Sequence, residues 1–166
     1  MKKILGLAFV ALVFTSCQKQ KIAYVDNGLV INEIKEKVDL EEKYNQKDEA
    51  FKRKVDSFRQ VFQLEYQKVA TLSKSQQESE LQALNQKAQG LQQTWQAEQQ
   101  KFQSEYQVEI DSLISKVKGF VKNYGKTNNY DYILGTVENS PSVMYGKKEN
   151  DITKKVIEDL NAAYKK

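Results

Sequence analysis

The sequence predicts a predominantly helical α+β protein, in which a small β-containing body carries a long antiparallel hairpin of two α-helices. Residues 40–124 contain no proline and two glycines, and Glu, Lys, Gln, Ala and Leu dominate them, as in long helices. Short β-branched and aromatic runs flank this stretch at residues 21–25 and 131–137, as in buried strands. We therefore assign residues 40–124 to a coiled-coil hairpin arm and expect the flanking runs to form the body at its base.

The first 16 residues have the order of an export signal. Lys2 and Lys3 precede an apolar run over residues 4–14, and small residues then lead to Cys17. The run has 11 residues, about half of the ~20 that a membrane-spanning helix needs. We therefore expect a cleaved signal peptide over residues 1–16 rather than a membrane-spanning anchor.

Residues 14–17, Phe-Thr-Ser-Cys, resemble the bacterial lipobox, whose cysteine is acylated and becomes the new N-terminus. The resemblance implies lipidation of Cys17; ordinary cleavage that leaves a free thiol is the alternative. Several acyl chains hold a protein stably on a membrane, so we expect a lipoprotein on a bacterial envelope membrane. Residues 18–21 contain no acidic cluster similar to surface-export signals. This favours the periplasm, with the outer membrane as the expected site of anchoring.

Residues 17–39 and 125–166 are predicted to form the body. The strand over residues 21–25 ends at a turn signal, and residues 29–38 have the apolar spacing of a short amphipathic helix. After a loop over residues 125–129, the run 131–137 predicts an interior strand, because its apolar side chains fall on both faces. Residues 142–145 predict a second short strand. A last helix is expected to begin at Asn150 or Asp151 and to end near Tyr164.

Apolar positions in the arm step by four and three, as in a coiled coil, with gaps at Glu65 and Glu98. If the chain reverses near residues 76–77, the two halves meet in mirror order and Phe58 faces Trp95. The predicted seam consists of Phe51, Val55, Phe58, Phe62, Val69, Leu72, Leu81, Leu84, Leu91, Trp95 and Phe102.

The same mirror order predicts the surroundings of the two interrupting glutamates. Glu65 falls opposite Ala88, and Glu98 falls opposite Val55. Each carboxylate is thus expected to meet an apolar residue rather than a base. The alternative is that both side chains extend to solvent along the arm surface.

The side chains that most catalytic and metal sites need are missing from the sequence. It contains no histidine, and its one cysteine is assigned to the anchor. Imidazole catalysis, Cys-His nucleophiles and zinc sites with nitrogen or sulfur ligands are therefore excluded. Carboxylates are scattered between lysines and glutamines, as on solvated helix faces. We expect no enzymatic activity, no bound metal and no cofactor.

Nucleotides and nucleic acids are not expected partners either. Residues 125–127, Gly-Lys-Thr, look like the end of a phosphate-binding loop, but Phe120 stands where that motif needs a glycine. The whole chain carries a net charge of +4, and loss of Lys2 and Lys3 leaves 24 basic against 22 acidic side chains, or +2. Nucleic-acid binding would require a clustered basic face instead.

Three stretches together resemble the Skp/OmpH family: residues 21–26 (KIAYVD), the Gln-, Lys- and Glu-rich hairpin, and residues 131–137 followed by 150–157 (NDITKKVI). The resemblance implies a homotrimer whose strands form a shared β-body, with three helical arms around a cavity. It also implies an ATP-independent chaperone that holds unfolded outer-membrane or exported proteins. On the family pattern the body and trimer core would contain Ile22, Tyr24, Val25, Ile133, Leu134, Val143 and Tyr145.

Three tyrosines outside the seam are candidate contacts to client proteins: Tyr44, Tyr66 and Tyr106. The alternative is that they pack against neighbouring arm residues. Between residues 63 and 92, three lysines balance three glutamates, so the arm tip is not basic. A function from another class also fits the hairpin: a lipid-anchored coiled-coil scaffold or spacer that binds one defined envelope partner.

Overall fold

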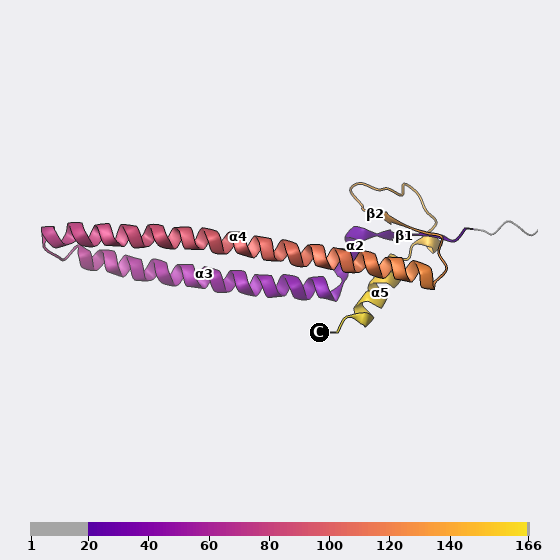
Figure 1. Ribbon diagram of the computed structural model, residues 1–166, viewed down its shortest axis with the longest axis horizontal. Helices are drawn as coiled ribbons and strands as arrows, with labels where there is room; N and C mark the ends of the chain where they lie inside the picture. The colour runs from indigo at the N-terminus through magenta and orange to yellow at the C-terminus, as the bar shows by residue number, and fades with distance from the viewer. Residues whose placement is uncertain (1–19, 166) are drawn as a thin grey trace, which may run out of the picture.

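The computed structural model describes residues 20–165 and shows a long helical hairpin that projects from a small body (Figure 1). The hairpin consists of α3 (Lys35–Val69) and α4 (Lys74–Thr127). The other elements are β1 (Ile22–Asp26), α2 (Asn27–Glu33), β2 (Tyr132–Thr136), the 3₁₀ turn η2 (Lys148–Asn150) and α5 (Thr153–Ala163). The predicted fold class is confirmed: the chain is predominantly helical and has a small β-containing body. Cys17 lies outside the described residues.

The sheet of the body joins segments from the two ends of the chain. β1 and β2 run parallel, with Ile22 beside Tyr132, and the whole hairpin forms the connection between them. The opposite edge of β1 is covered by a bridge between Tyr24 and Asp151. Within the described chain no strand covers the outer edge of β2. The strand predicted over residues 131–137 is therefore an edge strand in the single chain rather than an interior one.

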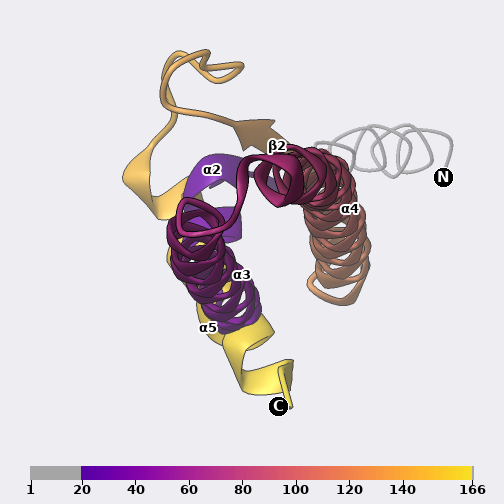
Figure 2. The same cartoon turned by 90° about the vertical axis from the view of Figure 1, so that its left-hand side faces the viewer.

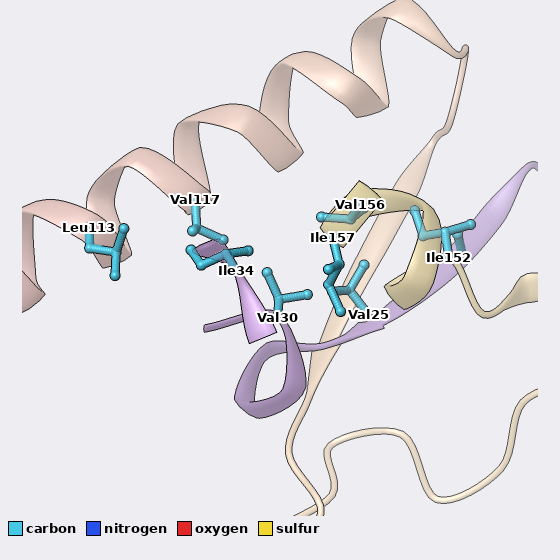
Figure 3. Packing of buried hydrophobic residues seen from close by; sticks show 9 residues of the cluster. Val25, Val30, Ile34, Leu113, Val117, Ile152, Val156 and Ile157 are labelled. Carbon is cyan, nitrogen blue, oxygen red and sulfur yellow. The ribbon is translucent and has the colours of Figure 1, made fainter. Parts of the chain in front are cut away.

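A hydrophobic core joins α2, α4 and α5 to one face of β1 (Figure 3). Successive side chains of a strand point to opposite faces, and in β1 Ala23 and Val25 are buried whereas Ile22 is exposed. The core cluster consists of Ala23, Val25, Val30, Ile34, Leu113, Val117, Ile152, Val156 and Ile157. Because α4 contributes to this cluster, the core holds the base of the hairpin.

A break at Ile34 separates the body from the arm. Ile34 has an extended backbone (φ −74°, ψ 137°) between α2 and α3, and its side chain is buried in the core. The backbone N–H of Lys35 donates to Oδ1 of Asn161 in α5 at 2.7 Å, which ties the start of α3 to the body. The single helix predicted over residues 29–38 is therefore wrong. Two helices meet there, and the arm helix begins at Lys35 rather than at residue 40.

The predicted start of the loop over residues 125–129 is also wrong, because α4 continues to Thr127. Gly125 is buried, and a Cβ atom at this position would lie 3.3 Å from Cδ1 of Ile133 in β2. The glycine thus allows a close approach of α4 to the sheet without ending the helix. The helix ends at Thr127 and is capped by Asn128. Asn129 follows in the left-handed region (φ 56°), which asparagine tolerates better than most residues.

The strand predicted over residues 142–145 is not formed in the single chain. This segment belongs to a loop in which Met144 and Tyr145 are 87% and 85% exposed. A strand needs a neighbouring strand to pair its backbone groups, and within residues 20–165 no strand pairs with this segment. The predicted start of the last helix is wrong as well. α5 begins at Thr153, because Asp151 pairs with β1 and its Oδ1 accepts a hydrogen bond from the N–H of Thr153 at 2.9 Å.

Candidate functional site

The arm is a two-helix structure in which α3 and α4 lie side by side (Figure 2). Aromatic side chains meet in the seam between them. The rings of Phe51 and Phe102 pack edge to face with centroids 6.2 Å apart, and those of Phe58 and Trp95 lie 6.1 Å apart. The predicted mirror order therefore holds at these positions.

Burial along this seam is uneven. A two-helix hairpin covers a seam residue from one side, so part of its surface stays in contact with water. Of the eleven predicted seam residues, Phe51, Val69 and Leu84 are buried, Leu72 and Leu81 are exposed, and Val55, Phe58, Phe62, Leu91, Trp95 and Phe102 are half-buried.

Five ion pairs bridge the two arms in one common register. In each pair the two residue numbers add to 152, and the closest charged atoms lie 2.7–3.2 Å apart. A slip of α3 along α4 would break all five pairs together. We call these five ion pairs the ladder. Exposed pairs contribute only about 0.2–1 kcal/mol each, so the ladder specifies the register more than it stabilises the arm. The five pairs are Glu36–Lys116, Lys43–Glu109, Lys47–Glu105, Lys54–Glu98 and Glu65–Lys87.

This ladder overturns the prediction for the two interrupting glutamates. Glu98 accepts a hydrogen bond from Nζ of Lys54 at 3.1 Å, and Glu65 accepts one from Nζ of Lys87 at 3.0 Å. The residue numbers of seam partners add to 153, one more than those of the ladder. The charged side chains therefore flank the seam, and each glutamate reaches a lysine adjacent in sequence to the apolar residue predicted opposite it.

The chain reverses over residues 70–73 rather than at residues 76–77. Nε2 of Gln77 donates to the carbonyl oxygens of Ala70 and Leu72 at 3.2 and 2.9 Å, which closes the turn. As a result the first turns of α4 extend beyond the end of α3 (Figure 1). The register is nevertheless centred on residue 76, because these overhanging turns form the tip.

Tyr44 and Tyr106 form a clasp near the base of the arm. Their rings meet edge to face at 5.0 Å, and the hydroxyl of Tyr44 donates to Oε1 of Glu109 at 2.9 Å. Burial, together with this hydrogen bond, raises the pKa of Tyr44 to about 12. The hydrogen bond from Lys43, at 2.7 Å, and the one from Tyr44 hold the pKa of Glu109 below its ordinary value.

All three tyrosines predicted as client contacts are thus engaged within the arm. The hydroxyl of Tyr66 donates to Oδ1 of Asn85 across the hairpin at 3.0 Å. Tyr44 and Tyr106 also line a surface groove of about 360 Å³ beside Phe102. This geometry favours the alternative stated for them, packing against neighbouring arm residues.

A larger groove, about 780 Å³ in volume, runs along the body between α4 and the sheet. Three lysines of α4 line it at intervals of four residues: Lys118, Lys122 and Lys126. The aliphatic side chains that line it come from β1, α2, α4, β2 and the residue after β2. They are Val25, Ile31, Ile114, Val117, Val121, Ile133 and Val137. The groove is therefore an apolar surface with a basic edge.

The residues predicted for a shared body are divided between core and surface in the single chain. Val25 is buried, Tyr24, Ile133 and Val143 are half-buried, and Ile22, Leu134 and Tyr145 are exposed. The loop that bears Val143 and Tyr145 is held close to β1 at Gly146, where a Cβ atom would lie 2.5 Å from Cε1 of Tyr24. The exposed members are available for contacts outside the chain.

Two kinds of site are absent from the part of the chain that the structure describes. No group of three or more histidine, cysteine, aspartate or glutamate side chains among residues 20–165 is placed to hold a metal ion. None of the helices in this range is both long and apolar enough to cross a membrane. The features that remain are the arm surface and the body groove.

Comparison with known families relates this geometry to a function. A family model described as outer membrane protein (OmpH-like) matches residues 21–160. The chain belongs to the OmpH-like family. The match begins just before β1 and ends within α5, so it covers the body and the arm together. None of the curated proteins matches the chain.

OmpH-like proteins are chaperones rather than enzymes. They act in the periplasm and bind outer membrane proteins. In this OmpH-like chain the features that sequence reasoning missed are the cross-arm ion pairs and the apolar groove of the body. The ion pairs had a signal in the sequence, because Lys54 and Lys87 adjoin the seam positions opposite the two glutamates. The groove had none, because it depends on how α4 crosses the sheet.

Proposed function

We propose that this protein is an ATP-independent holding chaperone, which keeps unfolded outer-membrane or exported proteins in a cavity between the helical arms of a homotrimer. The open hairpin supports this proposal most strongly. It projects from the body as two helices whose seam is half-buried over most of its length. Such an arm offers many weak contacts along its surface.

Energetics favour a client that stays unfolded. Fixing one residue costs roughly 1–2 kcal/mol, so ordering a client of about a hundred residues would require an implausibly large compensating affinity. The arms therefore hold the client by confinement and by many replaceable contacts. Such holding needs no nucleotide, because no folding work is done on the client.

The body supports assembly into a trimer. An apolar groove of about 780 Å³, the uncovered edge of β2 and the exposed side chains of Leu134, Met144 and Tyr145 lie on the same small body. Apolar surface gathered in this way is typical of interfaces. We propose that neighbouring copies cover it, as the family resemblance implies, and that Ile22 and Tyr145 become part of a shared core.

Lipidation at Cys17 completes the proposal. Cys17 precedes the first residue of β1, Ile22, by five positions in the sequence, so an anchor at Cys17 would tether the body, from which the arm projects (Figure 1). Replacement of Cys17→Ala should abolish fatty-acid labelling and release the protein from membranes. Labelling that persists in this variant would rule out Cys17 as the anchor.

The decisive experiment removes the arms and keeps the body. In the observed register Leu40 and Asp111 lie nearly opposite each other, because their numbers add to 151, so a short turn can join them. The full chain should keep a urea-unfolded β-barrel membrane protein from aggregating on dilution without ATP, at about one trimer per client. The shortened chain should trimerise but fail to protect.

Two outcomes would favour the scaffold alternative instead. One is that the armless body protects as well as the full chain. The other is that the full chain protects no client but retains a single folded envelope protein at fixed stoichiometry.

The trimer has its own test. Light scattering on the protein without its lipid should give three times the monomer mass. The change Ile133→Asp should dissociate or unfold the body, since an unpaired buried charge costs several kcal/mol. A fully helical monomer whose mass does not change with concentration would contradict the trimer.

A further inference from the structure

One stretch of the arm, between the ion pairs of Glu98 and Glu65, is almost free of charge. It comprises residues 55–64 of α3 and 88–97 of α4, about 15 Å of arm length. Its only charged side chains are Asp56 and Arg59, which bind each other at 2.7 Å. We call this stretch the neutral belt.

Two large apolar side chains of the neutral belt are accessible to solvent. Val61 and Leu64 are 44% and 58% exposed. The seam residues within the belt are all half-buried, whereas the seam is buried at Phe51 on the body side and at Val69 on the tip side. The belt therefore presents apolar surface without the charges that accompany it elsewhere on the arm.

We propose that the neutral belt is the part of the arm that holds apolar segments of an unfolded client chain. This inference rests on the proposed function and assigns its contact surface. An apolar segment that covers a charged side chain removes water from the charge, which is costly. In the belt this cost is small, because the belt has one charged pair, Asp56 and Arg59, whose opposite charges partly compensate each other.

Glutamine gives the belt a second property that suits an unfolded chain. Six of its twenty residues are glutamines, and each amide both donates and accepts hydrogen bonds. An unfolded segment carries unpaired peptide N–H and C=O groups, which are costly to bury without partners. The amides next to Val61 and Leu64 would supply these partners without selecting a sequence.

The size of the belt argues against a folded partner. A stable interface buries roughly 800 Å² on each partner, far more than two partly exposed side chains on a two-helix arm provide. Weak contacts that form and break suit a mobile client that touches several arms. The three tyrosines considered earlier are less suited, because their hydroxyls or rings are engaged within the arm.

The test replaces Val61 and Leu64 together by glutamine. Their exposure means that the arm should fold unchanged, which circular dichroism would verify. Affinity for a urea-unfolded β-barrel membrane protein should fall roughly fivefold to tenfold, as the apolar contact area is lost. The matched control replaces Val38 and Val108 together by glutamine. These two residues are 51% and 65% exposed but lie outside the belt among charged residues. It should change the affinity by less than about twofold.

A photo-crosslinking residue at position 64, compared with one at position 108, identifies the occupant. Crosslinks to client from position 64, and few from position 108, are expected. Crosslinks from position 64 to the arm of another copy would overturn the inference. If the unaltered protein binds no unfolded client, the proposed function fails as well. If it binds clients and the double variant binds them equally, this inference alone fails.

Discussion

The body and the arm of this protein are held together in different ways. In the body, nine buried apolar residues from β1, α2, α4 and α5 form one cluster. In the arm, which is the longer region in sequence, the buried apolar residues are Leu40, Phe51, Val69 and Leu84. The body thus depends on hydrophobic burial, whereas the arm depends on helix propensity, a half-open seam and a ladder of ion pairs.

This difference assigns a separate task to each region. A packed core tolerates little change in volume or charge, so the body specifies one arrangement and can support assembly. The arm has a thin seam, and a two-helix hairpin of this kind is marginal on its own. It can therefore present apolar surface to a client because it does not bury that surface in a core of its own.

The largest effect is expected from a charge placed in the body core. Val156 is fully buried, so Val156→Asp should destabilise the protein by at least about 4 kcal/mol or prevent folding. Urea unfolding followed by circular dichroism measures this loss. The control Val108→Asp, on the exposed arm surface, should stay within about 0.5 kcal/mol of the unaltered protein. Equal losses in the two variants would contradict the contrast between body and arm.

A cavity in the arm seam should have a smaller and more local effect. Phe51 is buried and packs edge to face with Phe102, so Phe51→Ala should cost about 3 kcal/mol of arm stability. Hydrogen exchange should become faster in residues 40–110 and remain unchanged in β1 and α5, because the body core does not include Phe51. Faster exchange throughout the chain would show that body and arm unfold together.

Exchanging the charges of one ion pair, Lys54–Glu98, tests whether the ladder specifies the register. Lys54→Glu faces Glu98 with a like charge and should cost about 0.5–1 kcal/mol. Adding Glu98→Lys should restore most of this loss, because the pair is re-formed with opposite polarity. Lys52→Glu is the control, since Lys52 pairs with Asp48 within α3. The absence of rescue by the second change would mean that the ladder has no energetic coupling.

The smallest effect concerns the clasp at Tyr44. Its pKa in the folded protein is about 12, above the ordinary value of 10.0, so the clasp contributes stability that is complete below pH 10 and is lost as the pH rises towards 12. The pKa of Glu109 is lowered, so its contribution is present above its ordinary pKa and is lost in acid. Burial also raises the pKa of Tyr124. Ultraviolet titration should therefore show late-ionising tyrosines, and the step near pH 12 should disappear in Tyr44→Phe; retention of that step would exclude Tyr44 as its source.

The sequence alone was sufficient for the features that depend on local periodicity. The helical arm, its apolar seam and the meeting of Phe58 with Trp95 follow from the spacing of apolar residues, because the period of an α-helix places these residues on one face. The strands at residues 22–26 and 132–136 follow from short β-branched and aromatic runs. The family resemblance also came from contiguous stretches of sequence, taken in their order along the chain.

The tertiary structure decided what depends on neighbours distant in sequence. Periodicity identifies the apolar face of each arm helix, but it does not show which side chains of the other helix lie opposite that face. The pairing of Glu98 with Lys54 could therefore be identified only from the register in the structure. Helix α4 continues past Gly125, where β2 packs closely against the helix. The chain breaks between α2 and α3 at Ile34, because the side chain of Ile34 is buried in the body core. The segment 142–145 has the composition of a strand but no partner strand within the described chain. Strand formation needs backbone groups supplied by another segment, and composition alone cannot provide them.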